Sequence, residues 1–287
     1  MTDASLPART ITPRGHLGTR LRDIVGYREL LLNLIRKELR VKYKSSILGF
    51  FWSLLNPAML LVVYYLVFSV VLGSGIPRFP IYLLSGLIVW NLFSVGLLTA
   101  TSSVVGNAGI VNKVWFPREV LPLSSVGAAL VHFFLQSLVL LAALTAFRHP
   151  VNWAYVPLLP VALVGLLLVL CAFAVLLSAA NVYLRDVQHL IELGLIAWFF
   201  ASPVVYSYNL IADKAGKWGW VYLANPVTDV VLIFQRAIYG DFVTVAHDES
   251  FGWYVRNLAY VYVLGFVLFF VAMAVFRRLE GNFAEEL

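Results

Sequence analysis

Six long stretches of this sequence carry no charged residue, and they constrain the fold more than any other feature. A helix needs about 20 apolar residues to cross roughly 30 Å of hydrocarbon. The six stretches are residues 47–73, 79–112, 121–147, 161–184, 193–212 and 257–276. Because backbone groups inside lipid must be hydrogen-bonded within the chain, such runs favour helices over strands. The sequence therefore predicts an all-α membrane protein with six transmembrane helices.

Composition excludes the soluble alternatives. Of the 287 residues 61% are hydrophobic and 13% are charged, whereas a soluble domain carries about 25% charged residues. This balance argues against soluble domains and disordered chains. Cys171 is the single cysteine, which excludes an intrachain disulfide and a cysteine-based metal cluster.

The placement of Lys and Arg predicts the orientation, because cytoplasmic loops are enriched in them. Ten precede the first predicted span, three lie in loops 113–118 and 185, and two follow the last span, which makes 15 of the 21. Both termini are therefore expected in the cytoplasm. The first 46 residues lack the apolar core of a cleavable signal peptide, so we expect the first span to act as an uncleaved insertion signal.

Residues 27–46 predict an amphipathic helix before the first span. Leucine and isoleucine side chains gather on one side and basic side chains on the other, while Glu38 and Lys42 interrupt the apolar side and can pair. Such a helix lies in the headgroup plane and attracts anionic lipid. The charges either fix topology alone or form a gate for an anionic lipid headgroup. The candidate headgroup contacts are Arg36, Arg40, Lys42 and Lys44.

The loop 112–122 mixes aromatic and charged residues, and its two prolines, Pro117 and Pro122, bracket a predicted short turn of helix. One interpretation is a membrane-surface anchor. The other is a docking surface whose aromatics, Trp115 and Phe116, fill a pocket on a cytoplasmic partner. The candidate docking residues are Lys113, Val114, Trp115, Phe116, Pro117, Arg118 and Glu119.

The motifs that carry chemistry are missing from the sequence. It holds no phosphate-binding G-x-x-x-x-G-K-[ST] loop, no H-E-x-x-H and no G-x-S-x-G. Among the histidines His132 alone falls within a span, where hydrogen bonding between helices together with Gln136 is the simpler explanation. We expect no catalytic residue, no metal site and no cofactor in this chain, which points to a conduit.

Aromatic residues make up 15% of the chain, and several lie within spans rather than at their ends. Ring faces stack on sugars, and Tyr and Trp add a hydrogen-bonding group. Each ring can equally pack against lipid or core. The candidate residues of a glycan path are Phe50, Trp52, Tyr64, Trp90, Trp198, Phe199 and Tyr206.

A set of short runs resembles the polysaccharide-type ABC-2 transporter permeases. The resemblance covers about residues 27–287 and leaves out 1–26. The runs are RVKYKSSILGFFW at 40–52 with Asn56-Pro57, YLLSGLIVW at 82–90, the loop 113–123 after Asn107, NVYLRDV at 181–187, SPVVY at 202–206, Asn225-Pro226 and FRRLE at 276–280.

The resemblance implies a homodimer of permeases in the bacterial cytoplasmic membrane, associated with two copies of a separate ATPase that binds ATP and Mg. Members export polymers linked to polyprenyl diphosphate, such as O-antigen, capsule, teichoic acid or cell-wall galactan; nucleic acid has no part in this. By resemblance, residues 27–46 form a gate helix, 110–122 a coupling helix and 209–255 re-entrant gate helices. The expected organisation is a flexible segment 1–26, a transmembrane domain 27–278 and a cytoplasmic tail 279–287.

Three alternatives stay open at this point. An ABC-2 exporter of a drug or small lipid would have the same spans. A membrane glycosyltransferase or acyltransferase would need a cluster of intramembrane acids or histidines. A purely structural membrane scaffold would need neither the basic helix nor the mixed loop.

Overall fold

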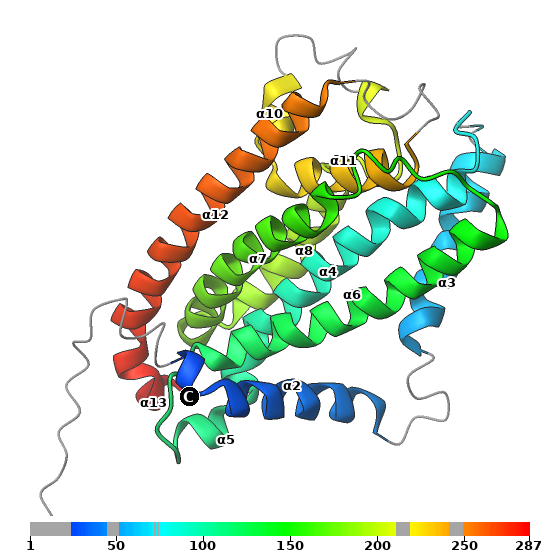
Figure 1. Cartoon of the computed structure of the whole chain (residues 1–287). Coiled ribbons are helices and arrows are strands. Elements are labelled where there is room, and N and C mark those ends of the chain that lie inside the picture. Colours follow the sequence, from blue (N-terminus) through cyan, green and yellow to red (C-terminus); the bar gives the residue numbers. More distant parts are fainter. Residues whose placement is uncertain (1–23, 45–51, 72, 74, 211–218, 241–248) are drawn as a thin grey trace, which may run out of the picture.

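The computed structural model describes residues 24–44, 52–71, 73, 75–210, 219–240 and 249–287, and within these ranges every regular element is a helix (Figure 1). Along the chain the helices are α2 (Arg28–Tyr43), α3 (Trp52–Tyr64) with its π-helical continuation η2 (Tyr65–Val71), α4 (Phe79–Gly106), α5 (Ala108–Val111), α6 (Val120–Ala146), α7 (Leu158–Tyr183), α8 (Asp186–Phe200), α10 (Gly219–Leu223), α11 (Pro226–Ile238), α12 (Phe251–Leu279), the 3₁₀ turn η4 (Glu280–Asn282) and α13 (Phe283–Glu286).

Four of these helices are long and apolar enough to cross a membrane: α4, α6, α7 and α12. They coincide with the second, third, fourth and sixth predicted spans, so an all-α, multi-pass membrane protein is confirmed. The α3–η2 helix occupies the first predicted span, and α8 occupies part of the fifth. Both are shorter, and the count of six spans stays a prediction.

The fifth predicted span differs most from the observed helix. It was placed at 193–212, whereas α8 begins at Asp186 and ends at Phe200. Asp186 and Glu192 are charged, so they fall outside the uncharged stretch that defined the predicted span. A helix can nevertheless hold charges where it emerges from hydrocarbon. At its other end the helix stops shortly before Pro203, because proline disfavours helical geometry in the residue that precedes it.

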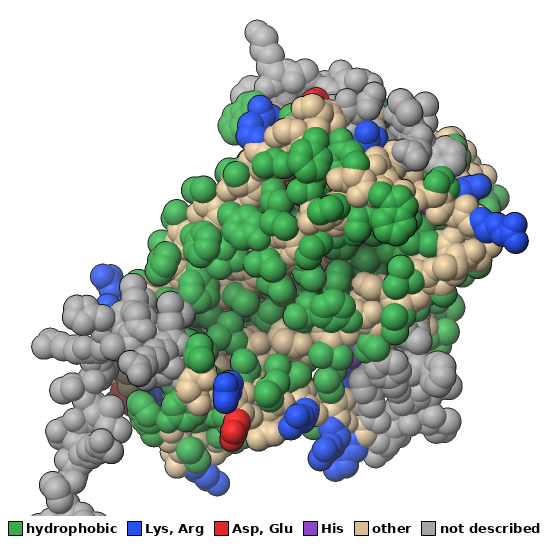
Figure 2. Space-filling view, viewed as in Figure 1, with side chains coloured by type: hydrophobic (Ala, Val, Ile, Leu, Met, Phe, Trp, Pro, Cys, Tyr) green, Lys and Arg blue, Asp and Glu red, His purple; other side chains and the backbone are tan. Residues whose placement is uncertain are grey.

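Helix α4 forms the centre of the bundle and is buried along most of its length. It packs against α6, α7, α8 and α11, while α7 also packs against α12. At Gly96 an added Cβ atom would lie 2.9 Å from Leu170 Cδ2, so the absence of a side chain lets α7 approach α4 closely. Hydrophobic side chains cover the middle of the face shown in Figure 2, with Lys and Arg near its two ends.

Two helices lie across the ends of the bundle rather than along it (Figure 1). Helix α2 crosses the end at which the C-terminus lies and packs against α6. Helix α11 crosses the opposite end and packs against α4, α7 and α12. The predicted amphipathic segment 27–46 is therefore helical over 28–43, and α10 and α11 fall within the segment 209–255. The segment after α12, predicted as a tail, folds back as η4 and α13.

Gly127 of α6 allows α2 to lie directly on the bundle. A Cβ atom at this position would be 2.5 Å from Ile35 Cδ1 and 2.9 Å from Ile35 Cγ1. These separations are too short for carbon atoms that are not bonded. A side chain at Gly127 must therefore displace the Ile35 side chain or α2 itself, at a cost of about 1–3 kcal/mol by the usual scale of overpacking.

We expect Gly127→Leu to lift α2 from α6. Cysteines introduced as Glu38→Cys and Ser125→Cys, in a Cys171→Ala background, should be joined efficiently by a short thiol cross-linker, because the native side chains touch. Adding Gly127→Leu should reduce the cross-linking several-fold. Gly194→Leu is the matched control, because an added Cβ atom there meets no atom within 4 Å. Undiminished cross-linking in Gly127→Leu would contradict this packing.

Candidate functional site

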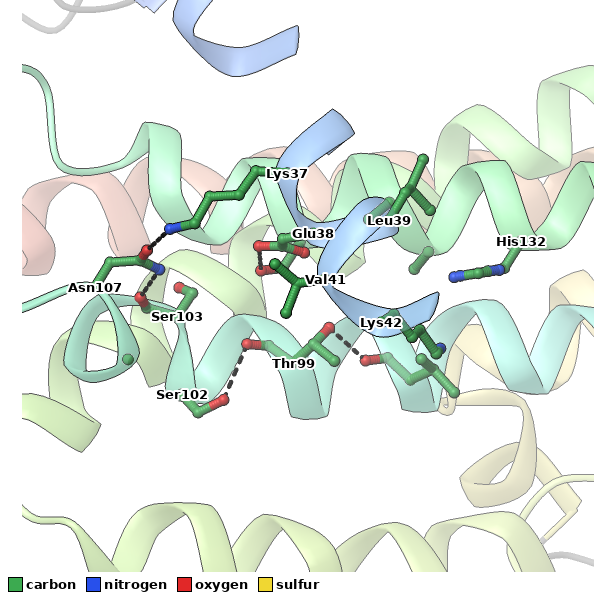
Figure 3. Close-up of a pocket in the computed structure, with 15 residues that line it drawn as sticks. Lys37, Glu38, Leu39, Val41, Lys42, Thr99, Ser102, Ser103, Asn107 and His132 are labelled. Carbon is green, nitrogen blue, oxygen red and sulfur yellow. Dashed lines mark hydrogen bonds between the residues drawn. The ribbon is translucent and has the colours of Figure 1, made fainter. Parts of the chain in front are cut away.

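A cavity of about 480 Å³ lies between α2, α4 and α6, at the end of the bundle that α2 crosses (Figure 3). Its walls combine charged groups of α2 with hydroxyl groups of the two long helices. The polar residues that line it are Lys37, Glu38 and Lys42 of α2, Thr99, Ser102 and Ser103 of α4, Asn107 at the end of α4, and Ser125 and His132 of α6. We call this cavity the α2 pocket.

Lys37 links α2 to the end of α4. Its ammonium donates to Asn107 Oδ1 at 2.8 Å, and Asn107 Nδ2 donates to the Ser103 carbonyl at 2.8 Å. Asn107 is the residue between α4 and α5, directly before the predicted docking loop. The contact therefore joins the amphipathic helix to the chain segment that leads into that loop.

Glu38 links α2 to α6. Its Oε1 accepts hydrogen bonds from Ser125 Oγ at 2.7 Å and Ser124 Oγ at 3.3 Å. Burial raises the pKa of the Glu38 carboxyl, against the opposing effect of these hydroxyls and of Lys37 and Lys42. Burial likewise lowers the pKa of the Lys42 ammonium, and the Glu38 charge opposes that shift. Glu38 and Lys42 thus interact as expected, because the charge of each one favours the charged form of the other.

Of the four basic residues predicted to meet a headgroup, Lys42 alone lines the α2 pocket. Arg36, Arg40 and Lys44 are exposed and point elsewhere, with Arg36 donating to Asn33 Oδ1 at 3.4 Å. Lys37, which belongs to the basic side of the helix but was not among the predicted headgroup contacts, also lines the pocket. A helical wheel separates polar from apolar sides, but it does not show how far a neighbouring helix end such as Asn107 extends around α2.

The predicted partners His132 and Gln136 separate in the structure. His132 points from α6 into the α2 pocket (Figure 3). Gln136 Oε1 accepts a hydrogen bond from Asn91 Nδ2 of α4 at 3.2 Å. The expected hydrogen bond between helices is therefore present at Gln136, where it joins α6 to α4.

A second, smaller cavity of about 250 Å³ lies between α3, α4 and α8 and brings three candidate glycan-path residues together. Tyr64 stacks on Phe199 with ring centroids 5.7 Å apart, and Trp90 contacts Phe199 at 5.4 Å. Asn91 and Ser94 add polar groups to the same walls. We call this cavity the aromatic groove.

The other candidate glycan-path residues lie apart from the groove. Trp198 Nε1 donates to Asn225 Oδ1 at 3.0 Å, and the Tyr206 hydroxyl bonds the Phe200 carbonyl and the Tyr222 hydroxyl. Trp52 is exposed at the start of α3. Phe50 lies outside the described residues.

The predicted docking residues divide into an exposed and a buried group. Val114 and Trp115 are 59% and 62% exposed, whereas Phe116 is 5% exposed and Glu119 is fully buried. The expectation that both aromatics are on the surface is therefore wrong for Phe116, which packs in a core cluster with Phe276 and Phe283. The predicted helix is also displaced: helix α5 ends at Val111, and residues 112–119 form turns before α6.

The segment that follows α12 packs against the base of this loop. The Arg118 guanidinium donates to the Glu280 carbonyl and lies over the Phe283 ring, 5.6 Å from its centroid. Phe283 is fully buried against Phe276, with ring centroids 5.4 Å apart. Residues 112–115 are thus held outward by a loop base that is part of the protein core.

Over the described residues, no three His, Cys, Asp or Glu side chains come together as metal ligands would.

Comparison with known proteins agrees with this arrangement. The profile of the ABC-2 type transporter family matches residues 29–239. The O-antigen export system permease protein RfbA of Myxococcus xanthus is 33% identical over 93% of this chain and 98% of its own length. RfbA of Klebsiella pneumoniae is 28% identical over 90% and 95%. The polysialic acid transport protein KpsM of Escherichia coli is 22% identical over 86% and 92%. The chain belongs to the ABC-2 type transporter family.

Proposed function

We propose that this chain is the transmembrane subunit of an ATP-driven exporter that moves a cell-surface polysaccharide, linked to polyprenyl diphosphate, across the bacterial cytoplasmic membrane to the outside. The observation that carries the proposal is similarity along nearly the whole chain to permeases named for O-antigen and polysialic acid export. In this proposal two copies of the chain form the path. Two copies of a separate ATPase bind ATP and Mg and supply the energy.

In the proposed orientation the α2 end of the bundle faces the cytoplasm. The basic residues that precede the first span and those in the last turn of α12 are then inside, as the excess of Lys and Arg requires. The α2 pocket and the docking loop share this side, whereas α11 faces outward. Substrate and ATPase would thus act on neighbouring parts of the same end.

The α2 pocket suits the phosphate groups of a lipid-linked glycan. Lys37 and Lys42 supply positive charge. The hydroxyls of Thr99 and Ser102 on the opposite wall donate to carbonyls of α4, and they would have to rotate to donate to a bound phosphate. Attraction of an anionic lipid is worth about 1 kcal/mol per basic residue near the surface. The pocket opens toward solvent beside an exposed basic side of α2, so a headgroup arriving from the membrane surface would reach it directly.

Replacing Lys37 and Lys42 together by Gln should reduce polymer export about tenfold or more, because two charges worth about 1 kcal/mol each are lost. The measurement is surface polymer in cells that depend on this permease, normalised to permease in the membrane. The matched control is Arg36→Gln with Arg40→Gln, which removes two charges of the same helix outside the pocket. Equal losses in both double variants would show that general surface attraction, not the pocket, explains the effect.

The aromatic groove suits the glycan itself. Stacked rings such as Tyr64 and Phe199 offer flat faces to sugars, and Asn91 and Ser94 lie beside them to meet hydroxyl groups. Many weak contacts of this kind bind a neutral polymer loosely enough to let it move. Helix α3 also presents exposed apolar side chains, including Met59 and Val63, which a second copy would cover in the proposed homodimer.

Tyr64→Ala should reduce export about 2–10-fold, because aromatic contacts contribute about 0.5–1.5 kcal/mol. Phe134→Ala removes an exposed ring of α6 away from both cavities and should leave export unchanged. The readout is the rate of polymer appearance at the cell surface after synthesis is induced. A Tyr64→Ala variant that exports at the normal rate would remove the groove from the proposed path.

The exposed pair Val114 and Trp115 suits the ATPase partner. A large aromatic side chain held outward on a rigid base is typical of residues that dominate protein interfaces, where truncation costs about 2 kcal/mol or more. Phe116 and Arg118 form that base rather than the contact surface.

Trp115→Ala should weaken association of the permease with its ATPase about 30-fold, as judged by co-purification from membranes. Val25→Ala is the control, since Val25 is a 66% exposed apolar residue near the start of α2. Phe116→Ala should instead lower the thermal stability of the isolated permease, because it opens a cavity in the core. Undisturbed co-purification of Trp115→Ala would contradict the docking role.

A further inference from the structure

Helix α11 carries a carboxyl group into the interior of the protein. Asn225 begins the helix, its Oδ1 accepting a hydrogen bond from Val227 N at 3.0 Å. Nearly every residue that follows in α11 is buried, and Asp229 in its first turn is only 1% exposed. An acid this deeply buried is rare in any protein unless it is paired.

Asp229 lacks the hydrogen bonds that normally accompany such burial. Within the described part of the chain, neither Oδ1 nor Oδ2 has a hydrogen-bond partner, and the same is true of the neighbouring Thr228 Oγ1 and of Asn257 Nδ2 on α12. Buried polar groups without partners are infrequent, and each requires a physical explanation.

The groups that face Asp229 carry no compensating charge. Tyr208, in the segment after α8, and Tyr260 of α12 lie within electrostatic range of its carboxyl, and Glu249 also acts on Tyr208. Among the described residues, no cation acts on Asp229. The one basic residue of α11, Arg236, lies about two turns further along, over the Tyr155 ring at 5.0 Å, and donates to the Gly240 carbonyl at 3.0 Å.

An ionised carboxyl in these surroundings would be strongly destabilised. Moving a lone carboxylate out of water costs far more free energy than its contacts in the protein can supply. A buried acid avoids this cost by remaining protonated. The neutral acid is thus the form compatible with a buried α11.

We propose that Asp229 is a proton-binding site that controls the seating of α11. While α11 lies against α4, α7 and α12, the carboxyl holds a proton. When α11 moves and water reaches the group, the proton passes to water and the carboxylate remains hydrated. Deprotonation therefore favours the displaced helix, and a rise in pH weakens the seated one.

The contacts of α11 connect this site to the rest of the bundle. Asn225 Nδ2 donates to Ser202 Oγ at 2.9 Å, and Gln235 Nε2 donates to the Pro203 carbonyl at 2.8 Å. Both partners lie directly after α8, whose Phe199 forms part of the aromatic groove. Movement of α11 must therefore break or carry along the segment that follows the groove. The proton site itself does not depend on the proposed cargo.

The test uses the full-length permease in lipid nanodiscs without ATPase or substrate. Infrared difference spectra of the wild type should contain a protonated-carboxyl band at neutral pH that Asp229→Asn lacks. Hydrogen exchange of residues 226–238, corrected for the intrinsic effect of pH, should rise between about pH 4, near the ordinary pKa of an aspartic acid, and about pH 8, to which burial raises the pKa of Asp229, by at most about tenfold per pH unit. In Asp229→Asn, which keeps the shape and the neutral form, the corrected exchange should not change with pH.

Glu285→Gln is the control, because it removes an exposed carboxyl and should behave as the wild type in both measurements. Three results would overturn the proposal: an infrared band that persists in Asp229→Asn, corrected exchange in the wild type that is independent of pH, or an ionised carboxyl whose exchange responds to Na⁺ or K⁺ instead. If a variant folds poorly, the infrared titration of the wild type alone still tests whether a carboxyl is protonated at neutral pH.

Discussion

Hydrocarbon offers the peptide backbone no hydrogen-bonding partner, and the rest of this structure depends on that constraint. The long segments satisfy their backbone as helices, and hydroxyls within them donate to carbonyls of the preceding turn, as Thr101 does to Leu97 O at 2.8 Å. The few side chains whose polar groups are not used in this way lie where α2 and α11 cross the ends of the bundle. Within the described part of the chain, the α2 pocket and the surroundings of Asp229 are two such places.

The two crossing helices are held by different forces. Helix α2 is held on α6 through close packing at Gly127 and through Glu38, and on the end of α4 through Lys37; water or an anion can replace the contacts of both charged side chains. Helix α11 is almost entirely buried and holds its acid without a partner. The α2 end is therefore suited to binding charged groups from solution, whereas at the α11 end a change of charge has to be accompanied by movement.

Features that extend over many consecutive residues could be predicted from the sequence, whereas contacts between distant parts of the chain could not. Twenty uncharged residues in a row identify a helix, and α4, α6 and α7 begin within a few residues of their predicted starts. The burial of Phe116 could not be predicted from its neighbours in the sequence, because the side chains that bury it, Phe276 and Phe283, lie near the end of the chain. The contact of Lys37 with Asn107 could not be predicted either, since the position of Asn107 follows from how α4 packs. Tyr64 and Phe199 share a groove because α3 and α8 both pack against α4.

The support of the docking loop by the far end of the chain has a consequence for how the protein is made. Arg118 bonds a carbonyl that lies 162 residues later, so during synthesis the loop emerges from the ribosome long before its base exists. Phe116 then lacks the ring of Phe283 that buries it. The surface formed by Val114 and Trp115 can reach its final shape only after α12 has been inserted. A truncated or incompletely inserted chain would therefore not present this surface, and partner binding would select for permeases that have finished folding.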